Sequence, residues 1–413
     1  MRLCSRSGLP LLGVTMQLVA GRAAADATQT SLAVPVCWAP SQQALNPTWT
    51  CPHNTSYLDG NGNDDSDNSD DIGRGLWEVR LSPGKGRGVF AVVDLPKGTR
   101  LLVEAPLFAV APPPLVPGVG FALAAMQPTV EDAFARLNPS QQDEFLSCHE
   151  VQFPGEAKED EEDAARGDAK SQAADHTGPR LMRILRSNAY TMQDGRIAVY
   201  PKVALINHDC RPNVVNTDRA RDGRRVIVAT RDIAAGEEVL TTYIPLLAST
   251  AARRARLAQY GFHCGCAACR QGDAAARGSM ADTAAADDDN DDDNDEQREH
   301  MGNVLEVLEK TLEGTDTVAD GGPAVHRARS HTAAALATYV ETQGFADYYV
   351  RTSRLAVEYA FRAGDGAAAV YWARKHLEHN RLADATSQEA RDAETLLAFV
   401  ERAQGENEKE KEN

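Results

Sequence analysis

The sequence predicts a mixed β and α fold, in which short β-sheets come first and an all-α helical-hairpin domain follows. Three observations lead to this prediction. Residues 75–243 alternate short apolar segments with Gly and Pro turns, three cysteines cluster at 264–269, and residues 301–405 repeat apolar positions at helical spacing. The chain has 413 residues, 42% of them hydrophobic, so it is long enough to build two or three cores.

The β-rich region begins near Trp77, where irregular polar sequence gives way to apolar segments rich in β-branched residues. A helix is expected over 130–145 and a second over 249–260, where Ser249 and Thr250 are candidate caps. A charged, Ala-rich insert at 155–179 interrupts the region. Strands are expected at 77–81, 88–92, 100–110, 196–201, 213–217, 224–233 and 237–244.

The last third of the chain is expected to be helical. Apolar residues recur every three or four positions, and Gly or Pro separates several of the segments. Such an array resembles tetratricopeptide-type hairpins, although no clean 34-residue signature is present. A domain of this kind is usually a packing or recognition surface. The expected helices are 304–312, 324–343, 345–364, 367–383 and 388–403, with an acidic disordered linker at 271–300 before them and a charged tail at 406–413 after them.

The net charge of −17 is concentrated in three acidic runs, at 59–71, 156–163 and 281–296. These runs carry more negative charge than the whole chain, so the remainder is slightly positive. Segments this polar are typical of solvated linkers. No direct nucleic-acid binding is therefore expected, and a basic peptide stays open as a partner. A membrane span is not expected either, because no stretch approaches the ~20 apolar residues that a span requires.

The N-terminal arm, residues 1–73, allows two interpretations. Arg2 and Arg6, a moderately apolar segment and small residues at 23–25 fit a secretory signal, whereas Pro10 and Gly13 weaken it. A secreted chain would pair Cys37 with Cys51 and carry a glycan at the sequon that begins at Asn54. A disordered intracellular arm is the alternative.

Cys264, Cys266 and Cys269 form a C-x-C-x-x-C pattern, which suits a metal better than disulfides because such near neighbours cannot easily bridge one another. A structural zinc takes four ligands, so one is missing. The candidates are Cys210, Cys148, the N-terminal cysteines and His263, and Cys210 is favoured because its loop "ALINHDCRPN" needs an anchor. Three buried free thiols are the structural alternative. A zinc on Cys210 would bring Asn207, His208 and Phe262 together.

Four motifs together resemble a known family. "GKGRGVFA" at 84–91, "NHDCRPN" at 207–213, "GEEVLTTY" at 236–243 and "YGFHCGCAAC" at 260–269 resemble the SET-domain protein lysine methyltransferases with a post-SET zinc loop. The likeness is greatest to the SMYD-like group, in which a helical domain follows the zinc loop. It covers about 75–270, and the insert at 111–180 matches poorly. No MYND zinc finger is expected, because no cysteine falls between Cys51 and Cys148.

This resemblance implies S-adenosylmethionine as methyl donor, zinc at the four cysteines and a lysine-containing protein or peptide as substrate. Tyr243 would be the catalytic tyrosine and Phe262 the aromatic that stacks on adenine. Asn207 and His208 would hold the adenine and the methionyl amine. The turn Gly86, Arg87, Gly88 and the asparagine Asn188 would contact the amino-acid end of the cofactor, with Tyr190 in place of a usual aromatic.

The resemblance divides the chain into a SET domain at 75–243, a post-SET zinc loop at 244–270 and the helical domain at 301–405. Asp209 departs from the family, which usually has serine there, and it adds a carboxylate close to the zinc thiolates. A non-catalytic SET-like scaffold that presents its helical tail to a partner is the rival function. An intracellular location, in nucleus or cytoplasm, is expected because thiolate-bound zinc and a cytosolic methyl donor both prefer a reducing compartment. A monomer is also expected.

Overall fold

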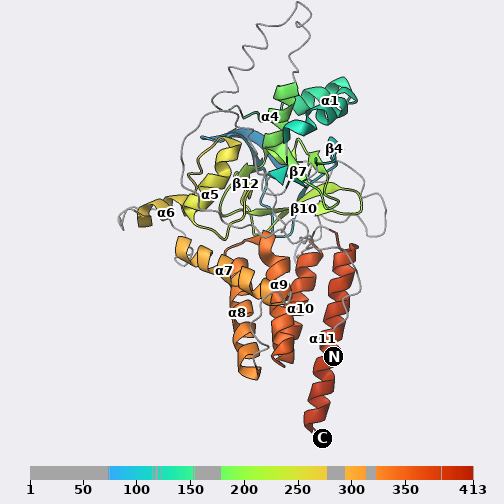
Figure 1. Cartoon of the computed structure of the whole chain (residues 1–413), viewed down its shortest axis with the longest axis vertical. Coiled ribbons are helices and arrows are strands. Elements are labelled where there is room, and N and C mark those ends of the chain that lie inside the picture. Colours follow the sequence, from blue (N-terminus) through green and yellow to red (C-terminus); the bar gives the residue numbers. More distant parts are fainter. Residues whose placement is uncertain are drawn as a thin grey trace, which may run out of the picture.

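The computed structural model describes residues 73–113, 115–151, 153, 178–276, 294–312 and 322–412, except Arg74, 117–119, Ala122 and Ala383 within those ranges. The predictions for the N-terminal arm, including Cys37, Cys51 and Asn54, lie outside the described residues, as does almost all of the insert at 155–179. Figure 1 shows the β-sheets gathered at one end of the molecule and the long C-terminal helices at the other, which confirms the predicted fold class.

The first sheet builds the centre of the β region. Its order is β1 (Trp77–Ser82), β2 (Gly86–Ala91), β12 (Glu238–Thr241) and β9 (Asn207–His208). Neighbours pair antiparallel except β12 and β9, which run parallel with Leu240 opposite Asn207 and Thr241 opposite His208. This parallel pair places the Asn-His motif beside the strand that leads to Tyr243.

Three smaller sheets surround the first. The predicted strand 100–110 is divided in two, because Pro106 cannot donate a ladder hydrogen bond and separates β3 from β4. The second sheet has the order β10 (Val214–Arg219), β11 (Arg224–Ala229) and β3 (Arg100–Glu104). The third sheet has the order β4 (Phe108–Val110), β8 (Ile197–Val199) and β7 (Ala189–Thr191). The fourth is a hairpin of β5 (Leu115–Val116) and β6 (Gly120–Phe121).

The helix expected over 130–145 is two helices, α1 (Gln127–Ala135) and α2 (Pro139–Leu146). The break falls at Asn138, whose side chain accepts a hydrogen bond from Gln141 N while the Gln141 side chain accepts one from Asn138 N. This capping box followed by a proline starts a new helix. The turn η3 (Leu123–Met126) precedes α1, and α4 (Gly178–Asn188) packs against α1 and α2.

The cysteine loop lies between α5 (Thr250–Leu257) and α6 (Ala267–Ala276). The short turn η6 (Ala258–Tyr260) follows α5, and Gly261 ends it with φ 75°. A Cβ at Gly261 would lie 2.7 Å from a methyl of Val151, so a side chain is excluded there by both backbone and space. A second short turn, η5 (Val203–Leu205), precedes β9.

The C-terminal region is helical, as predicted. It contains α7 (Asp295–Leu312), α8 (Pro323–Thr342), η8 (Ala346–Tyr348), α9 (Tyr349–Arg362), α10 (Gly366–Asn380) and α11 (Gln388–Glu412). Helices α8 to α11 pack in sequence order, each against the next (Figure 1). Three helix ends differ from expectation: α6 ends and α7 begins inside the range 271–300 expected as linker, and α11 runs through the expected tail.

The start of α7 has a tertiary cause. The Asp295 carboxylate accepts hydrogen bonds from Thr250 N at 2.8 Å and Thr250 Oγ1 at 2.9 Å, which ties the first turn of α7 to the first turn of α5. An acidic residue in the first turn also suits the helix dipole. The sequence pattern alone gives no sign of this distant partner.

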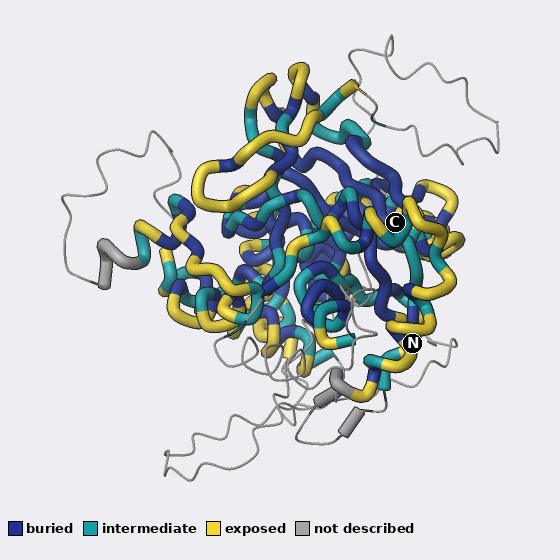
Figure 2. The backbone as a smooth tube through the Cα atoms, turned by 90° about the horizontal axis from the view of Figure 1, so that it is seen from above, coloured by how far each residue is buried: buried dark blue, intermediate teal, exposed yellow. Residues whose placement is uncertain are grey.

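One hydrophobic core joins the cysteine loop to the helical domain. The buried cluster that contains Cys210 and Cys269 continues through Leu305 and Phe345. Figure 2 shows that the buried backbone is continuous through the middle of the molecule. The cysteine side chains of the loop are therefore buried in this core, whereas Phe262 and His263 of the same loop are exposed.

Arg298 of α7 adds polar contacts to this junction. Its side chain is 1% exposed, donates to Cys210 O at 3.2 Å and Leu246 O at 3.4 Å, and lies over the Phe345 ring at 4.6 Å. Tyr348 OH also accepts a hydrogen bond from Leu246 N at 3.0 Å. The helical domain thus holds the backbone of the Cys210 loop directly.

In the part of the chain that the structure covers, no helix is both long and apolar enough to cross a bilayer.

Candidate active site and metal centre

The four predicted cysteines meet in the structure. The sulfur atoms of Cys210, Cys264, Cys266 and Cys269 all lie within 4.8 Å of one another, and the Cys210 and Cys269 sulfurs are 3.7 Å apart. Cys210 reaches this cluster from the loop after β9, fifty-odd residues before the others. Among the described residues, the structure brings Cys210 to the C-x-C-x-x-C loop, as expected, whereas the N-terminal cysteines lie outside the described residues. The role of the four cysteines as metal ligands stays a prediction.

The cluster fits a zinc ion. Four thiolates at the usual Zn–S distance of about 2.3 Å form a tetrahedron whose edges are about 3.8 Å, close to the Cys210–Cys269 separation. Hydrogen bonding among the sulfurs lowers the pKa of Cys266 to about 5 and that of Cys269 as well, and it raises the pKa of Cys210. The pKa of Cys264 is also raised. Arg253, which is fully buried, lies 3.9 Å from the Cys269 sulfur. The thiolate form is therefore favoured at Cys266 and Cys269, and the protonated thiol at Cys210 and Cys264.

Asp209 lies at the edge of this cluster, as its position in the motif requires. Burial raises the pKa of its carboxyl to about 6, and the nearby Cys266 adds to the rise. Its Oδ1 accepts a hydrogen bond from Arg211 N at 2.9 Å, and its backbone N–H donates to Thr241 O at 2.9 Å. The loop conformation is therefore held by β12 as well as by the sulfurs.

His208 lies between the cysteine cluster and Tyr243. Its Nδ1 accepts a hydrogen bond from Tyr243 N at 3.2 Å, and its Nε2 is 3.4 Å from the Cys210 sulfur. Burial lowers the pKa of the imidazole to about 3, so the ring is neutral. The His208 ring is also 5.4 Å from the Tyr243 ring and 6.1 Å from the Phe262 ring, measured between centroids.

Tyr243 stands in a group of aromatic rings. Its ring centroid is 5.2 Å from that of Tyr260 and 6.3 Å from that of Phe262. Its hydroxyl donates to Ile206 O at 2.7 Å. Burial raises the pKa of the phenol well above its ordinary value, so Tyr243 keeps its proton. Phe262 is 37% exposed, as an open stacking platform would be.

Tyr260 was missed by the sequence interpretation. It precedes Phe262 by two residues, and an aromatic pair on a tight turn beside a metal loop was the available signal. Its ring lies against Tyr243 from the side of the cysteine loop. The phenol of Tyr243 is therefore enclosed by apolar ring faces.

The glycine turn approaches the Asn-His motif closely. A Cβ at Gly88 would lie 2.5 Å from Glu238 Oε1 and 2.8 Å from Asn207 Nδ2, so any larger residue would have to displace these two side chains. Asn207 Nδ2 donates to Arg87 O at 3.0 Å and to Glu238 Oε1 at 2.8 Å. Gly86 adopts φ 79°, which favours glycine at the turn. The predicted cofactor residues 86–88 and 207 thus share one hydrogen-bonded unit.

Asn188 lies at the end of α4 and contacts a segment that the sequence interpretation missed. Its amide nitrogen donates to His149 O at 2.6 Å and to Ile184 O at 2.7 Å. In the same segment, Arg87 donates to Ser147 O and Arg186 to Val151 O. Residues 147–151 therefore connect the glycine turn to Asn188. The role of Asn188 towards a cofactor stays a prediction.

Tyr190 lies apart from the rings of Tyr243 and Phe262. Its ring packs edge-on against Tyr200, with centroids 5.9 Å apart, and the Arg225 guanidinium lies over it at 5.0 Å. Burial raises the pKa of Tyr190 to about 12. The raised pKa of Tyr243 comes mainly from burial, and the charge of a Tyr190 phenolate would add to it.

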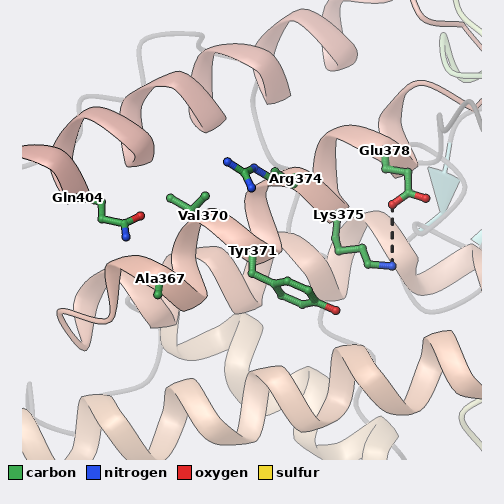
Figure 3. Close-up of a pocket in the computed structure, with 7 residues that line it drawn as sticks. All are labelled: Ala367, Val370, Tyr371, Arg374, Lys375, Glu378 and Gln404. Carbon is green, nitrogen blue, oxygen red and sulfur yellow. Dashed lines mark ion pairs between the residues drawn. The ribbon is translucent and has the colours of Figure 1, made fainter.

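A separate cavity of about 470 Å³ lies on the helical domain. Figure 3 shows Tyr371, Arg374 and Lys375 of α10 facing it, with Gln404 of α11 on the opposite side. Lys375 pairs with Glu378 at 3.8 Å, and Tyr371 is 53% exposed. The recognition role expected for the helical domain stays a prediction.

Comparison with known proteins identifies the class of the β region. Residues 86–244 match the family model of the SET domain, so the chain carries a SET domain there. This range contains the glycine turn, the Asn-His motif, Cys210 and Tyr243. The SET resemblance read from the four motifs is confirmed.

The relatives are lysine methyltransferases by name. The chain is 32% identical over 195 residues to the histone-lysine N-methyltransferase set5 of Schizosaccharomyces pombe, a match that covers 47% of this chain and 50% of the relative. It is 40% identical over 95 residues to the N-lysine methyltransferase SMYD2-B of Danio rerio and 39% over 99 residues to human SMYD2. The chain spans about half the length of set5 and about a fifth of the SMYD2 proteins.

Proposed function

We propose that the chain is an S-adenosylmethionine-dependent protein-lysine N-methyltransferase. The observation that carries the proposal is the meeting of Tyr243, His208 and Phe262 beside four clustered cysteines, within a SET domain. The names of the relatives support the reaction class, and the aromatic group around Tyr243 supports a site where an alkyl chain can approach a phenol.

The residues that would hold the cofactor are the glycine turn 86–88, Asn188, Asn207, His208 and Phe262. Two observations support the fit: the backbone at Gly88 closely approaches the side chains of Asn207 and Glu238, and Phe262 is partly exposed. When bound, S-adenosylmethionine supplies an electrophilic methyl group on a sulfonium. Stacking on an aromatic ring is worth about 1–3 kcal/mol for nucleic-acid bases, and Phe262 would contribute on that scale.

Tyr243 would orient the lysine amine. Because its phenol keeps its proton, it acts as a hydrogen-bonding group and is not a base. The lysine must arrive neutral although its reference pKa is ~10.4, and the rings of Tyr243 and Tyr260 favour the neutral amine by excluding water. The ammonium proton is therefore lost to solvent before the amine reaches these rings. Holding the amine in line is the main contribution of these side chains.

The four cysteines would hold a structural zinc, since all four positions of a tetrahedron are filled by protein and none is left for catalysis. We extend the proposal to a reducing compartment, because the five cysteines among the described residues are free thiols. Cell fractionation followed by immunodetection tests this location, and recovery from the secreted fraction would contradict it.

The test of the proposed function is Tyr243→Phe, assayed by label transfer from methyl-labelled S-adenosylmethionine into cell-extract proteins. We expect transfer to fall by at least about 100-fold, the scale of one active-site hydrogen-bond donor. Cofactor affinity should stay nearly unchanged. The matched control is Tyr359→Phe, which removes a buried hydroxyl that donates to Leu308 O at 2.8 Å in the helical domain.

Unchanged transfer by Tyr243→Phe would refute the assignment of this tyrosine. If the unaltered chain transfers no label yet binds the cofactor, the rival interpretation as a scaffold replaces the enzyme.

A further inference from the structure

Tyr243 is held at both ends by one short segment of chain. Strand β12 ends at Thr241, so the sheet no longer holds the backbone at Tyr243. Instead, Tyr243 N donates to His208 Nδ1 at 3.2 Å, and Tyr243 OH donates to Ile206 O at 2.7 Å. The position of the phenol therefore depends on residues 206–208.

The same segment is attached to the cysteine cluster through His208. The side chain is 4% exposed, and its Nε2 lies 3.4 Å from the Cys210 sulfur. Cys210 is the one member of the four-cysteine cluster that does not come from residues 264–269. Its sulfur is thus the point at which the segment that holds Tyr243 would meet a metal.

The hydrogen bonds fix the tautomer of His208. Because Nδ1 accepts the Tyr243 backbone N–H, it carries no hydrogen of its own. The single hydrogen of the neutral ring is therefore on Nε2, which faces the Cys210 sulfur. A metal-bound cysteine is a thiolate and accepts such a bond.

From this geometry we propose that His208 is a positioning residue that couples the metal centre to Tyr243. Its Nε2–H donates to the Cys210 thiolate, and its Nδ1 holds the backbone of the tyrosine. The coupling rests on the proposed function only in that Tyr243 is the catalytic residue; the physical link between metal and tyrosine does not depend on it. Hydrogen bonds to metal ligands typically change metal affinity or activity by about 10–100-fold.

Two substitutions separate the two bonds. His208→Asn retains an acceptor near the Nδ1 position and lacks a donor that reaches the sulfur. His208→Gln extends an amide towards the Nε2 position and lacks an acceptor at the Nδ1 position. His300→Asn is the matched control, because His300 is exposed on α7.

The first measurement is made on the full chain loaded with zinc or with Co²⁺. We expect His208→Asn to release zinc to a chelator about 10-fold faster or more, and to shift the sulfur-to-cobalt charge-transfer absorption. His208→Gln should retain more of the slow release. His300→Asn should match the unaltered chain in both readouts.

The second measurement follows the backbone amide of Tyr243 by nuclear magnetic resonance after selective ¹⁵N-tyrosine labelling, with Tyr243→Phe to assign the signal. We expect zinc removal and His208→Gln each to move this signal, and His208→Asn to move it less. The proposal is overturned if zinc release and the cobalt spectrum of His208→Asn equal those of the unaltered chain, or if the Tyr243 amide does not respond to zinc removal. Neither readout requires methyl transfer, so a chain that transfers no label still decides the proposal.

Discussion

Replacing Arg298 with methionine tests how firmly the helical domain supports the metal loop. The substitution keeps a long apolar side chain against Phe345 and removes the donors to Cys210 O and Leu246 O. Both acceptors are carbonyls in a buried junction, and hydrogen bonds from charged groups are worth about 1.5–3 kcal/mol each. At 3.2 and 3.4 Å these bonds are long, so the lower figure applies to each.

The expected loss is about 2–4 kcal/mol of unfolding free energy. The two hydrogen bonds supply about 3 kcal/mol, and the cation–π contact of the guanidinium with the Phe345 ring supplies about 1 kcal/mol more. Part of this loss is offset, because the methionine variant no longer bears the cost of burying a charged guanidinium. Because a chain of this size need not unfold in one step, the assay follows two probes during urea unfolding: tryptophan fluorescence and release of bound zinc.

We expect Arg298→Met to release zinc at a lower urea concentration than the unaltered chain does. In this variant, zinc release should coincide with the fluorescence change or precede it. The control is Arg136→Met, which removes a side chain that is 79% exposed and whose ion pair with Asp132 is 3.9 Å long. That pair should contribute less than about 0.5 kcal/mol. If Arg298→Met changes the free energy by no more than the control does, the reasoning from the two carbonyls is wrong.

Three further predictions follow from the site. Cys210→Ala should reduce bound zinc from one per chain to a weak or absent level by metal assay, because three thiolates leave the tetrahedron open; a full zinc complement would contradict the assigned ligand set. Gly88→Ala should weaken cofactor binding by calorimetry about tenfold or more, since its Cβ would displace the side chains of Asn207 and Glu238; equal affinity would show that the turn yields freely. Burial raises the pKa of Glu104 to about 7 from 4.5, so the folded state binds its proton more tightly and stability falls as pH rises between these values. Glu104→Gln should flatten this dependence, which amounts to about 3 kcal/mol at most, and urea midpoints at pH 5 and pH 8 that differ as much as in the unaltered chain would refute it.

The sequence predicted those parts of the site that depend on local patterns. The C-x-C-x-x-C loop supplies three cysteines, and a structural zinc takes four ligands, so the fourth ligand had to come from a distant segment. Cys210 was the favoured candidate. Gly and Pro turns indicated the strands, and helical spacing indicated the C-terminal domain. These features depend on residue type and short spacing, so they can be read without knowing which segments meet.

Features that arise from long-range contacts could not be read in this way. The parallel pairing of β9 with β12 joins two segments of ordinary local sequence. The buried Arg298 looked like one charge among many in an acidic stretch, and its carbonyl partners lie far away in the sequence. The carbonyls of residues 147–151 carry no sequence signal at all, because every residue has one. Tertiary context decides such cases.

The continuous core between the cysteine loop and the helices has a consequence for how the protein can be divided. A shortened chain that ended before α7 would expose the Cys210 loop and the residues that pack on Phe345 to water. It would also lose the Arg298 guanidinium, which donates to Cys210 O and Leu246 O. The SET region should therefore not survive as an independent fragment. The C-terminal helices and the SET region then form a single folding unit, because they share one buried cluster.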